Sequence, residues 1–165
     1  MKNSENKINS NNSKFLYSII TPVYNEEKNI HLLHDRLLKV FAEIGGKYEW
    51  IIIDDHSSDS SYEIIKNLAT ENSNVYGMRL SKNYGSHKAI TAGLSIVKGD
   101  LAIVMASDLQ DPPETIPEMI NKWQTGTQIV WAVRNMRIGE TALTKALSLF
   151  YYWIMRKVVF FRYGY

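Results

Sequence analysis

The 165-residue chain contains no cysteine. This absence excludes a disulfide framework, a zinc site built on thiolates and a cysteine nucleophile, so any bound metal must use oxygen or imidazole ligands. The chain also lacks the glycine-rich motifs G-x-G-x-x-G and G-x-x-x-x-G-K-[ST]. A dinucleotide-binding fold and a P-loop enzyme are therefore excluded, because both use glycines to bring phosphate close to the backbone.

Long apolar runs are missing at both ends of the chain. Residues 1–14 are rich in Asn, Ser and Lys without the apolar core of a secretory signal, and we expect a disordered lead-in there. Towards the C-terminus, the apolar stretch 146–155 has only ten residues and includes Ser148. A membrane-spanning helix needs about twenty residues, so this stretch does not predict one.

Charge is distributed unevenly along the sequence. Residues 134–165 carry six basic side chains against one acid, whereas residues 1–133 carry 13 basic and 16 acidic side chains. Nucleic-acid-binding proteins spread Lys and Arg over their working face, so we expect no nucleic-acid partner. We expect residues 141–165, with aromatic residues at 150–153, to form an amphipathic tail at an anionic membrane surface. Packing of this tail on other segments is an equal alternative. The first interpretation places the protein in the cytoplasm, peripheral to the membrane.

Apolar runs alternate with helical patterns over residues 15–140. Strands are predicted at 16–21, 49–53, 75–80, 101–105 and 128–133. Helices are predicted from an N-cap at Asn25 to residue 44, around 64–68, and over 88–97 and 114–124. This alternation predicts an α/β fold, with a mostly parallel sheet that carries helices on both faces. Ligands bind such sheets outside the carboxyl ends of the strands.

Polar residues follow every predicted strand. After the first strand, Tyr24 offers a flat surface and Glu26 an acceptor. Asp55, after the second strand, is suited to accept a hydrogen bond from a ribose hydroxyl or a base N–H, whereas Asp54 is equally suited to capping the next helix. His31 and His34 lie three residues apart in a predicted helix far from the strand ends, so we expect surface or packing roles rather than a metal pair.

The segment after the fourth strand predicts a metal site. Asp108 lies at the strand end, and the amide oxygen of Gln110 follows two positions later. This pairing suits Mg²⁺ or Mn²⁺, which take few protein ligands and complete their shell with substrate phosphates. Asp111, directly before two prolines, is expected to begin a turn.

Four segments in order carry a family resemblance: Y-S-I-I-T-P-V-Y-N-E-E (17–27), W-I-I-I-D-D-H-S-S-D (50–59), R-L-S-K-N-Y-G (79–85) and S-D-L-Q-D-P-P-E (107–114). They closely resemble family 2 glycosyltransferases, which have the GT-A, Rossmann-like fold. The subgroup they most resemble is the polyprenyl-phosphate glycosyltransferases, such as dolichyl-phosphate mannosyltransferase. The resemblance runs from about residue 17 to residue 150 and implies a nucleotide-sugar-binding domain over 15–140.

The resemblance also implies residue roles. Asp108 and Gln110 occupy the metal positions, and Arg134 matches a basic residue that approaches the sugar diphosphate, so Asp108 and Arg134 are the catalytic candidates. Ala106 stands where the family has the first Asp of its D-x-D motif. The nucleotide-sugar-binding candidates are Pro22, Tyr24, Glu26, Ile53, Asp55, Ala106, Ser107 and Lys88.

The expected reaction moves a sugar from a nucleotide-diphosphate sugar to a polyprenyl phosphate or a glycan precursor of the cell surface. The family continues beyond the position of Tyr165 with an acceptor-side segment and transmembrane helices, so a shortened chain is expected. Together with Ala106, this favours a binding-only remnant as the alternative. A sugar-phosphate nucleotidyltransferase is a weaker alternative, because it needs a glycine-rich basic loop after the first strand.

Overall fold

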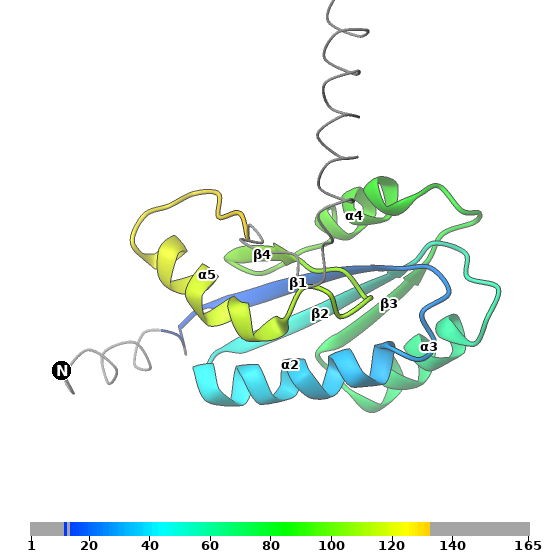
Figure 1. The fold of residues 1–165 in the computed structure, drawn as a ribbon, viewed down its shortest axis with the longest axis horizontal. Helices are drawn as coiled ribbons and strands as arrows, with labels where there is room; N and C mark the ends of the chain where they lie inside the picture. The colour runs from blue at the N-terminus through cyan, green and yellow to red at the C-terminus, as the bar shows by residue number, and fades with distance from the viewer. Residues whose placement is uncertain (1–11, 13, 133–165) are drawn as a thin grey trace, which may run out of the picture. The chain divides into compact units, whose positions relative to one another are not determined.

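The computed structural model describes residues 12 and 14–132, and the fold below is that of the unit Met1–Val130. In the described part of the chain, four parallel strands form one sheet in the order β3-β2-β1-β4 (Figure 1). The predicted parallel sheet is therefore confirmed. The strands are β1 (Leu16–Val23), β2 (Lys47–Asp54), β3 (Val75–Arg79) and β4 (Leu101–Val104).

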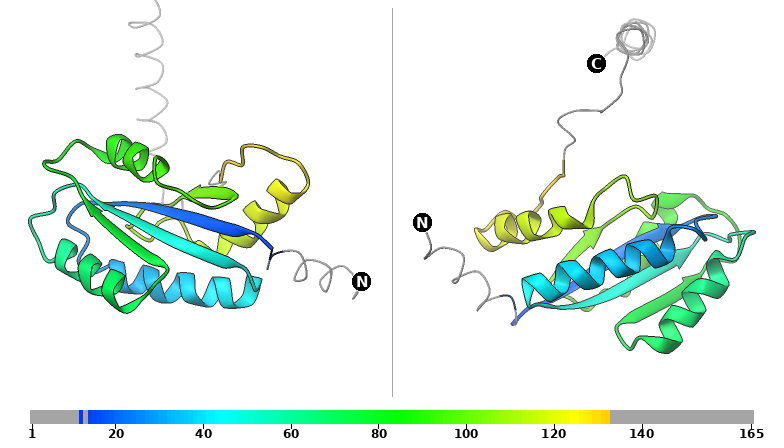
Figure 2. Two further views of the ribbon diagram at one scale, coloured as in Figure 1. Left: turned by 180° about the vertical axis from the view of Figure 1, so that it is seen from behind. Right: turned by 60° about the horizontal axis from the view of Figure 1, so that its bottom comes forward.

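Helices cover both faces of this sheet, as the alternation predicts (Figures 1 and 2). The helix α4 packs on β1 and β2 from one side, whereas the other helices share a core on the opposite side. The helices are α2 (Ile30–Ile44), α3 (Ser61–Glu71), α4 (Ser86–Leu94) and α5 (Ile116–Gln124), which follows the 3-10 turn η1 (Pro113–Thr115).

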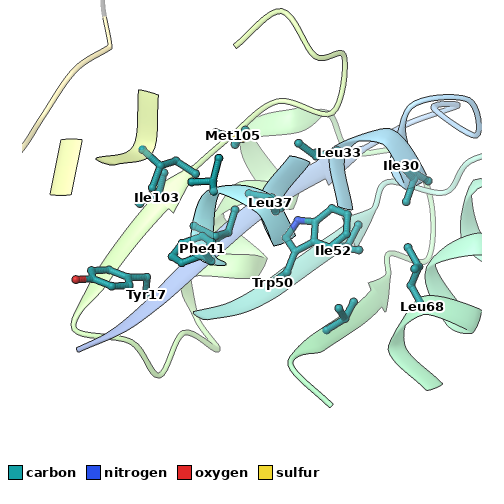
Figure 3. Packing of buried hydrophobic residues seen from close by; sticks show 14 of the residues in the cluster. Tyr17, Ile30, Leu33, Leu37, Phe41, Trp50, Ile52, Leu68, Ile103 and Met105 are labelled. Carbon is teal, nitrogen blue, oxygen red and sulfur yellow. The ribbon is translucent and has the colours of Figure 1, made fainter. Parts of the chain in front are cut away.

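The larger core lies between the sheet and α2, α3 and α5 (Figure 3). Trp50 is fully buried at its centre, and its indole N–H donates to Oγ1 of Thr21 at 2.9 Å. The smaller core joins Ile51 and Ile53 to α4. Gly93 lets α4 approach the sheet, because a methyl group there would lie 2.5 Å from Cγ2 of Ile20.

His34 confirms the packing role expected for it. Its ring stacks on Trp50 with centroids 5.7 Å apart, and its Nε2 is buried with no hydrogen-bond partner among the described residues. A charged imidazole would be poorly solvated there. Burial accordingly lowers the pKa of His34 below its usual value of 6.5.

This burial predicts a pH effect on stability. Below pH 6.5 the unfolded chain takes up a proton at His34 that the folded chain does not, so the unfolding free energy should decrease as the pH falls through this range. The variant His34→Phe should show a smaller decrease between pH 7.5 and pH 5.5 in urea denaturation. His87→Phe, at an exposed position of α4, is the control and should keep the parent slope. Equal slopes for both variants would contradict the prediction.

Two sequence predictions are wrong. Asn25 does not cap α2, which begins after Asn29; Asn25 instead adopts a φ of 58° and holds the neighbouring loop. The predicted strand 128–133 does not form over its described residues, 128–132. Ile129 there is 71% exposed. A β-branched run favours extended chain, but a strand also needs a ladder partner, and within the described residues β4 pairs only with β1.

Candidate functional site

A cavity of about 220 Å³ opens at the carboxyl ends of β1, β2 and β4, where parallel α/β sheets bind ligands. Segments far apart in the sequence build it, from the loops after β1 and β4, the end of β2 and the start of α4. Its lining residues are Pro22, Val23, Tyr24, Glu26, Asp55, Ser86, Ala106, Ser107 and Asp108.

Backbone strain is concentrated in the loops around this cavity. Among the described residues, three non-glycine residues have positive φ: Asn25 at 58°, His56 at 64° and Leu109 at 59°. They lie in the loops after β1, β2 and β4 respectively. Such conformations cost about 1–3 kcal/mol each and persist only where the surroundings impose them. The three residues therefore lie at the same edge of the sheet as the cavity.

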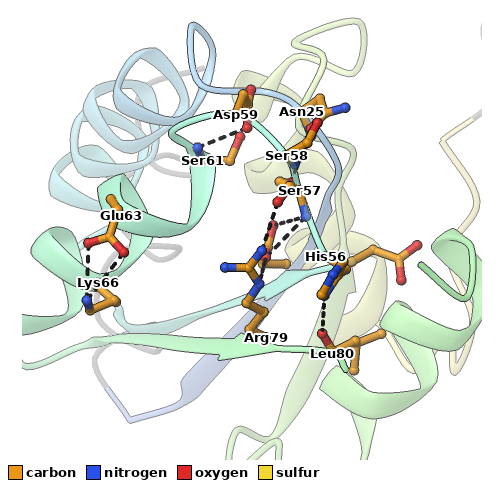
Figure 4. Close-up of polar contacts among 12 residues, drawn as sticks. Asn25, His56, Ser57, Ser58, Asp59, Ser61, Glu63, Lys66, Arg79 and Leu80 are labelled. Carbon is orange, nitrogen blue, oxygen red and sulfur yellow. Dashed lines mark hydrogen bonds and ion pairs between the residues drawn. The ribbon is translucent and has the colours of Figure 1, made fainter. Parts of the chain in front are cut away.

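The loops after β1 and β2 are locked together by hydrogen bonds (Figure 4). The backbone N–H of Asn25 donates to Oγ of Ser57 at 2.9 Å, and that of Glu26 donates to Oγ of Ser61 at 2.9 Å. In return, Oδ1 of Asn25 accepts from the backbone N–H of Ser58 at 2.8 Å. These bonds hold Tyr24 and Glu26 at the cavity, with the Tyr24 side chain 49% exposed.

Asp54 has a structural role. Its fully buried carboxylate accepts from the backbone N–H of Ser57 at 3.1 Å and pairs with Nε of Arg79 at 3.2 Å. Arg79 also donates to the carbonyl of Ser57 at 2.8 Å (Figure 4). Its guanidinium lies over the ring of Tyr62, 4.7 Å from the ring centroid. Asp54 therefore caps the turn after β2 rather than the helix α3, whose N-cap is Ser60.

Asp55 faces the cavity, although only 3% of it is exposed. Its Oδ1 accepts from the backbone N–H of Tyr84 at 2.8 Å, and its Oδ2 accepts from that of Gly85 at 2.7 Å. Both oxygens therefore hold the loop that leads into α4. Each carboxylate oxygen has a second lone pair, so a ligand N–H or O–H can still be accepted.

The loop after β4 presents Asp108. Ser107 ties this loop to β1, because its hydroxyl donates to the carbonyl of Pro22 at 3.1 Å. Leu109 packs against the larger core with its strained φ, while Asp108 stays exposed at the cavity. Oδ1 of Asp108 accepts from the backbone N–H of Gln110 at 3.0 Å.

The charge of the lining favours a cationic or hydrogen-bond-donating ligand. Three carboxylates, those of Glu26, Asp55 and Asp108, line the cavity, and none of its lining residues is basic. These carboxylates are not clustered, since the described residues contain no group of three His, Cys, Asp or Glu able to hold a metal. A diphosphate would therefore enter more readily with a cation than alone.

The structure brings together most of the residues singled out by the sequence, and seven of them line the cavity. Ile53 is buried in the smaller core, and Lys88 and Gln110 are exposed outside the lining. Arg134 and the tail 141–165 lie outside the described residues. The sequence analysis did not identify Ser86 as a site residue. The only sequence feature that points to it is its position after Gly85, at the start of α4. The predicted site residues that line the cavity are Pro22, Tyr24, Glu26, Asp55, Ala106, Ser107 and Asp108.

Sequence comparison finds a family match over most of the chain. The model described as Glycosyl transferase family 2 matches residues 18–164. Glycosyltransferase YkcC of Bacillus subtilis is 42% identical over 136 residues, which are 82% of this chain and 42% of that protein. The undecaprenyl-phosphate 4-deoxy-4-formamido-L-arabinose transferase of Shewanella sediminis is 46% identical over 121 residues, 73% of this chain and 37% of that protein. The chain thus spans about two fifths of the length of these relatives.

A solved structure shares the fold. Glucosyl-3-phosphoglycerate synthase from Mycobacterium tuberculosis, solved with Mn²⁺, uridine diphosphate and phosphoglyceric acid, matches with a TM-score of 0.58 and 21% identity. The match covers 76% of this chain and 45% of that one. At this identity the likeness concerns the fold alone.

Proposed function

This chain belongs to glycosyl transferase family 2 and has the GT-A fold, and we propose that it binds a nucleotide-diphosphate sugar for transfer of the sugar to an acceptor. One observation carries the proposal: Tyr24, Glu26, Asp55 and Asp108 converge from the three loops after β1, β2 and β4 on one cavity at the carboxyl edge of the sheet. The proposed ligand also agrees with the uridine diphosphate bound in the M. tuberculosis enzyme.

We assign the nucleoside to the β1–β2 side of the cavity. The exposed ring of Tyr24 offers a stacking surface for the base, which is worth about 1–3 kcal/mol. Glu26 and Asp55 supply acceptors for ribose hydroxyls or a base N–H. Pro22, Ser107 and Ala106 complete the wall, and Ile53 contributes from the core behind it.

The diphosphate belongs on the Asp108 side. Asp108 and Gln110 are the proposed holders of Mg²⁺ or Mn²⁺, and such an ion, when bound, would neutralise charge on the diphosphate. The donor set fits, because one exposed carboxylate suffices for an ion that takes its other ligands from water and substrate phosphates. Lys88 and Arg134 are proposed to add cationic stabilisation near the leaving group.

A polyprenyl phosphate is the acceptor we propose, as the name of the S. sediminis relative suggests. A phosphate nucleophile is already anionic and needs no strong general base, whereas a sugar hydroxyl does. A glycan acceptor is the second candidate. If Ala106 weakens metal binding, the chain would hold nucleotide without transferring sugar.

Calorimetry tests nucleotide binding. UDP or GDP with Mn²⁺ should bind the parent chain, and Tyr24→Ala should weaken binding about tenfold, because a stacked base loses its platform. Tyr76→Ala is the matched control, since Tyr76 is 40% exposed but outside the cavity lining. Equal affinity of both variants would contradict the assignment. Transfer to undecaprenyl phosphate, measured with labelled nucleotide sugars, separates an enzyme from a binding-only protein.

The tail carries a separate membrane prediction. Residues 141–165 should bind anionic vesicles reversibly, because each Lys or Arg near such a surface contributes about 1 kcal/mol. The aromatic residues at 150–153 should add apolar burial that salt does not screen. Co-sedimentation should therefore weaken with salt without vanishing, and a chain ending at Gly139 should stay in the supernatant. If both chains stay there at low salt, the peripheral membrane location loses its support.

None of the helices in the described part of the chain is long and apolar enough to cross a membrane.

A further inference from the structure

In the connection between β3 and α4, the N–H of Leu80 donates to the carbonyl of Asp54 at 2.9 Å, which holds the start of the connection. The loop that follows, residues 81–86, is attached mainly through one side chain, that of Asp55. Residues 81–86 are all exposed. The contacts of Ser81 and Lys82 with Tyr84 stay inside the loop, as does the bond from the Gly85 N–H to Oδ1 of Asn83 at 3.1 Å. Among the described residues, the hydrogen bonds that tie residues 81–86 to the segment after β2 are the two that Asp55 accepts.

The chemistry of these two bonds requires a carboxylate. Both bonds are short, at 2.8 and 2.7 Å, and charge-assisted hydrogen bonds of this kind are about twice as strong as neutral ones. Asparagine has one uncharged acceptor oxygen, so in the orientation of Asp55 it could bond only one of the two N–H groups, and more weakly. Because Asp55 is 3% exposed, water would not readily replace the lost acceptor.

The backbone conformation of Gly85 links the loop held by Asp55 to the start of α4. Gly85 has a φ of 86° directly before α4, so the chain turns there from the two N–H groups that Asp55 accepts into the helix. The next residue, Ser86, opens α4 and lines the cavity beside Asp55. The position of the cavity wall at Ser86 therefore depends on the Asp55 carboxylate, which also faces the cavity.

We propose that Asp55 is a positioning residue, which anchors the loop 81–86 and thereby places Ser86 and the start of α4 against bound nucleotide. Its effect on nucleotide affinity then arises largely through the loop, in addition to any direct contact. The consequence for binding rests on the proposed function, whereas the anchoring itself does not.

Amide hydrogen exchange by NMR, on the full chain without nucleotide, tests the anchoring. The N–H of Tyr84 is the reporter, because that of Gly85 also has Asn83 as an acceptor. In Asp55→Ala the Tyr84 amide should exchange about tenfold faster or more, since its acceptor is lost. An unchanged rate in a folded Asp55→Ala chain would overturn the proposal.

A second variant disturbs the loop and leaves the carboxylate intact. An added methyl group at Gly85 meets nothing within 4 Å, so Gly85→Ala acts through its positive φ alone. Gly45→Ala is the matched control, because Gly45 has a φ of 70°, equally free space, and a place at the C-cap of α2, outside the cavity lining. Gly85→Ala should speed exchange at Tyr84, and Gly45→Ala should not.

Titration with UDP and with GDP, each with Mn²⁺, tests the consequence. Asp55→Ala and Gly85→Ala should each weaken binding about tenfold, and the double variant should be little weaker than the weaker single variant, because both act on one element. Normal affinity in Gly85→Ala, with faster exchange at Tyr84, would show that the loop does not serve binding and would overturn the positioning role. If the parent chain binds neither nucleotide, the proposed function fails, while the exchange measurements still decide the anchoring.

Discussion

Replacing Asp108 by alanine should abolish the response of nucleotide affinity to divalent metal. In the parent chain, Mn²⁺ should strengthen UDP or GDP binding at least tenfold, because the ion offsets repulsion between the diphosphate and a cavity lined by three carboxylates. Without Asp108 the ion loses the one lining carboxylate of the β4 loop. Calorimetric titrations with Mn²⁺ and with a chelator measure both quantities.

Asp111→Ala provides the control for this prediction. Asp111 is an exposed carboxylate three residues further along the same loop, outside the cavity lining. This variant should keep the full metal response if Asp108 is specifically required. The metal assignment would be wrong if the Asp108→Ala chain responded normally, or if a chelator left the affinity of the parent chain unchanged.

Asp54→Ala should be strongly destabilising although the residue does not line the cavity. Removing one partner of a buried ion pair costs about 3–5 kcal/mol, and the lower end applies because the Arg79 side chain is 34% exposed. The turn at Ser57 would lose its acceptor as well. Urea denaturation should show a loss of about 3 kcal/mol in unfolding free energy.

The exposed pair of Glu118 and Lys122 is a suitable comparison. Its charged atoms are 3.0 Å apart, but both side chains are more than half exposed. Surface pairs of this kind contribute about 0–1 kcal/mol, so Glu118→Ala should change stability little. A loss below about 1 kcal/mol for Asp54→Ala would show that the pair with Arg79 is no more important than a surface contact.

Local sequence signals predicted most of the site, because its residues follow directly after strands. The apolar run before Tyr24 and the one before Asp108 end at the edge where parallel sheets bind ligands. Ser86 carried no comparable signal, since a serine after glycine is common at helix starts. Its place at the cavity depends on the fold of the loop 81–86 against Asp55.

The sequence by itself determined the four strands, the helices between them and the parallel arrangement of the sheet, because the periodicity of buried side chains is a local property. The sequence favoured Asp55 over Asp54 for the cavity, but only the tertiary structure decided what holds each carboxylate. Asp54 ends β2 and meets Arg79, while Asp55 follows the strand and meets the loop before α4, and these partners are distant in sequence. The predicted strand 128–133 is a second feature that the sequence alone could not decide. Its residues favour extended backbone, but a strand exists only where a neighbouring edge accepts and donates its hydrogen bonds, and that depends on contacts distant in sequence.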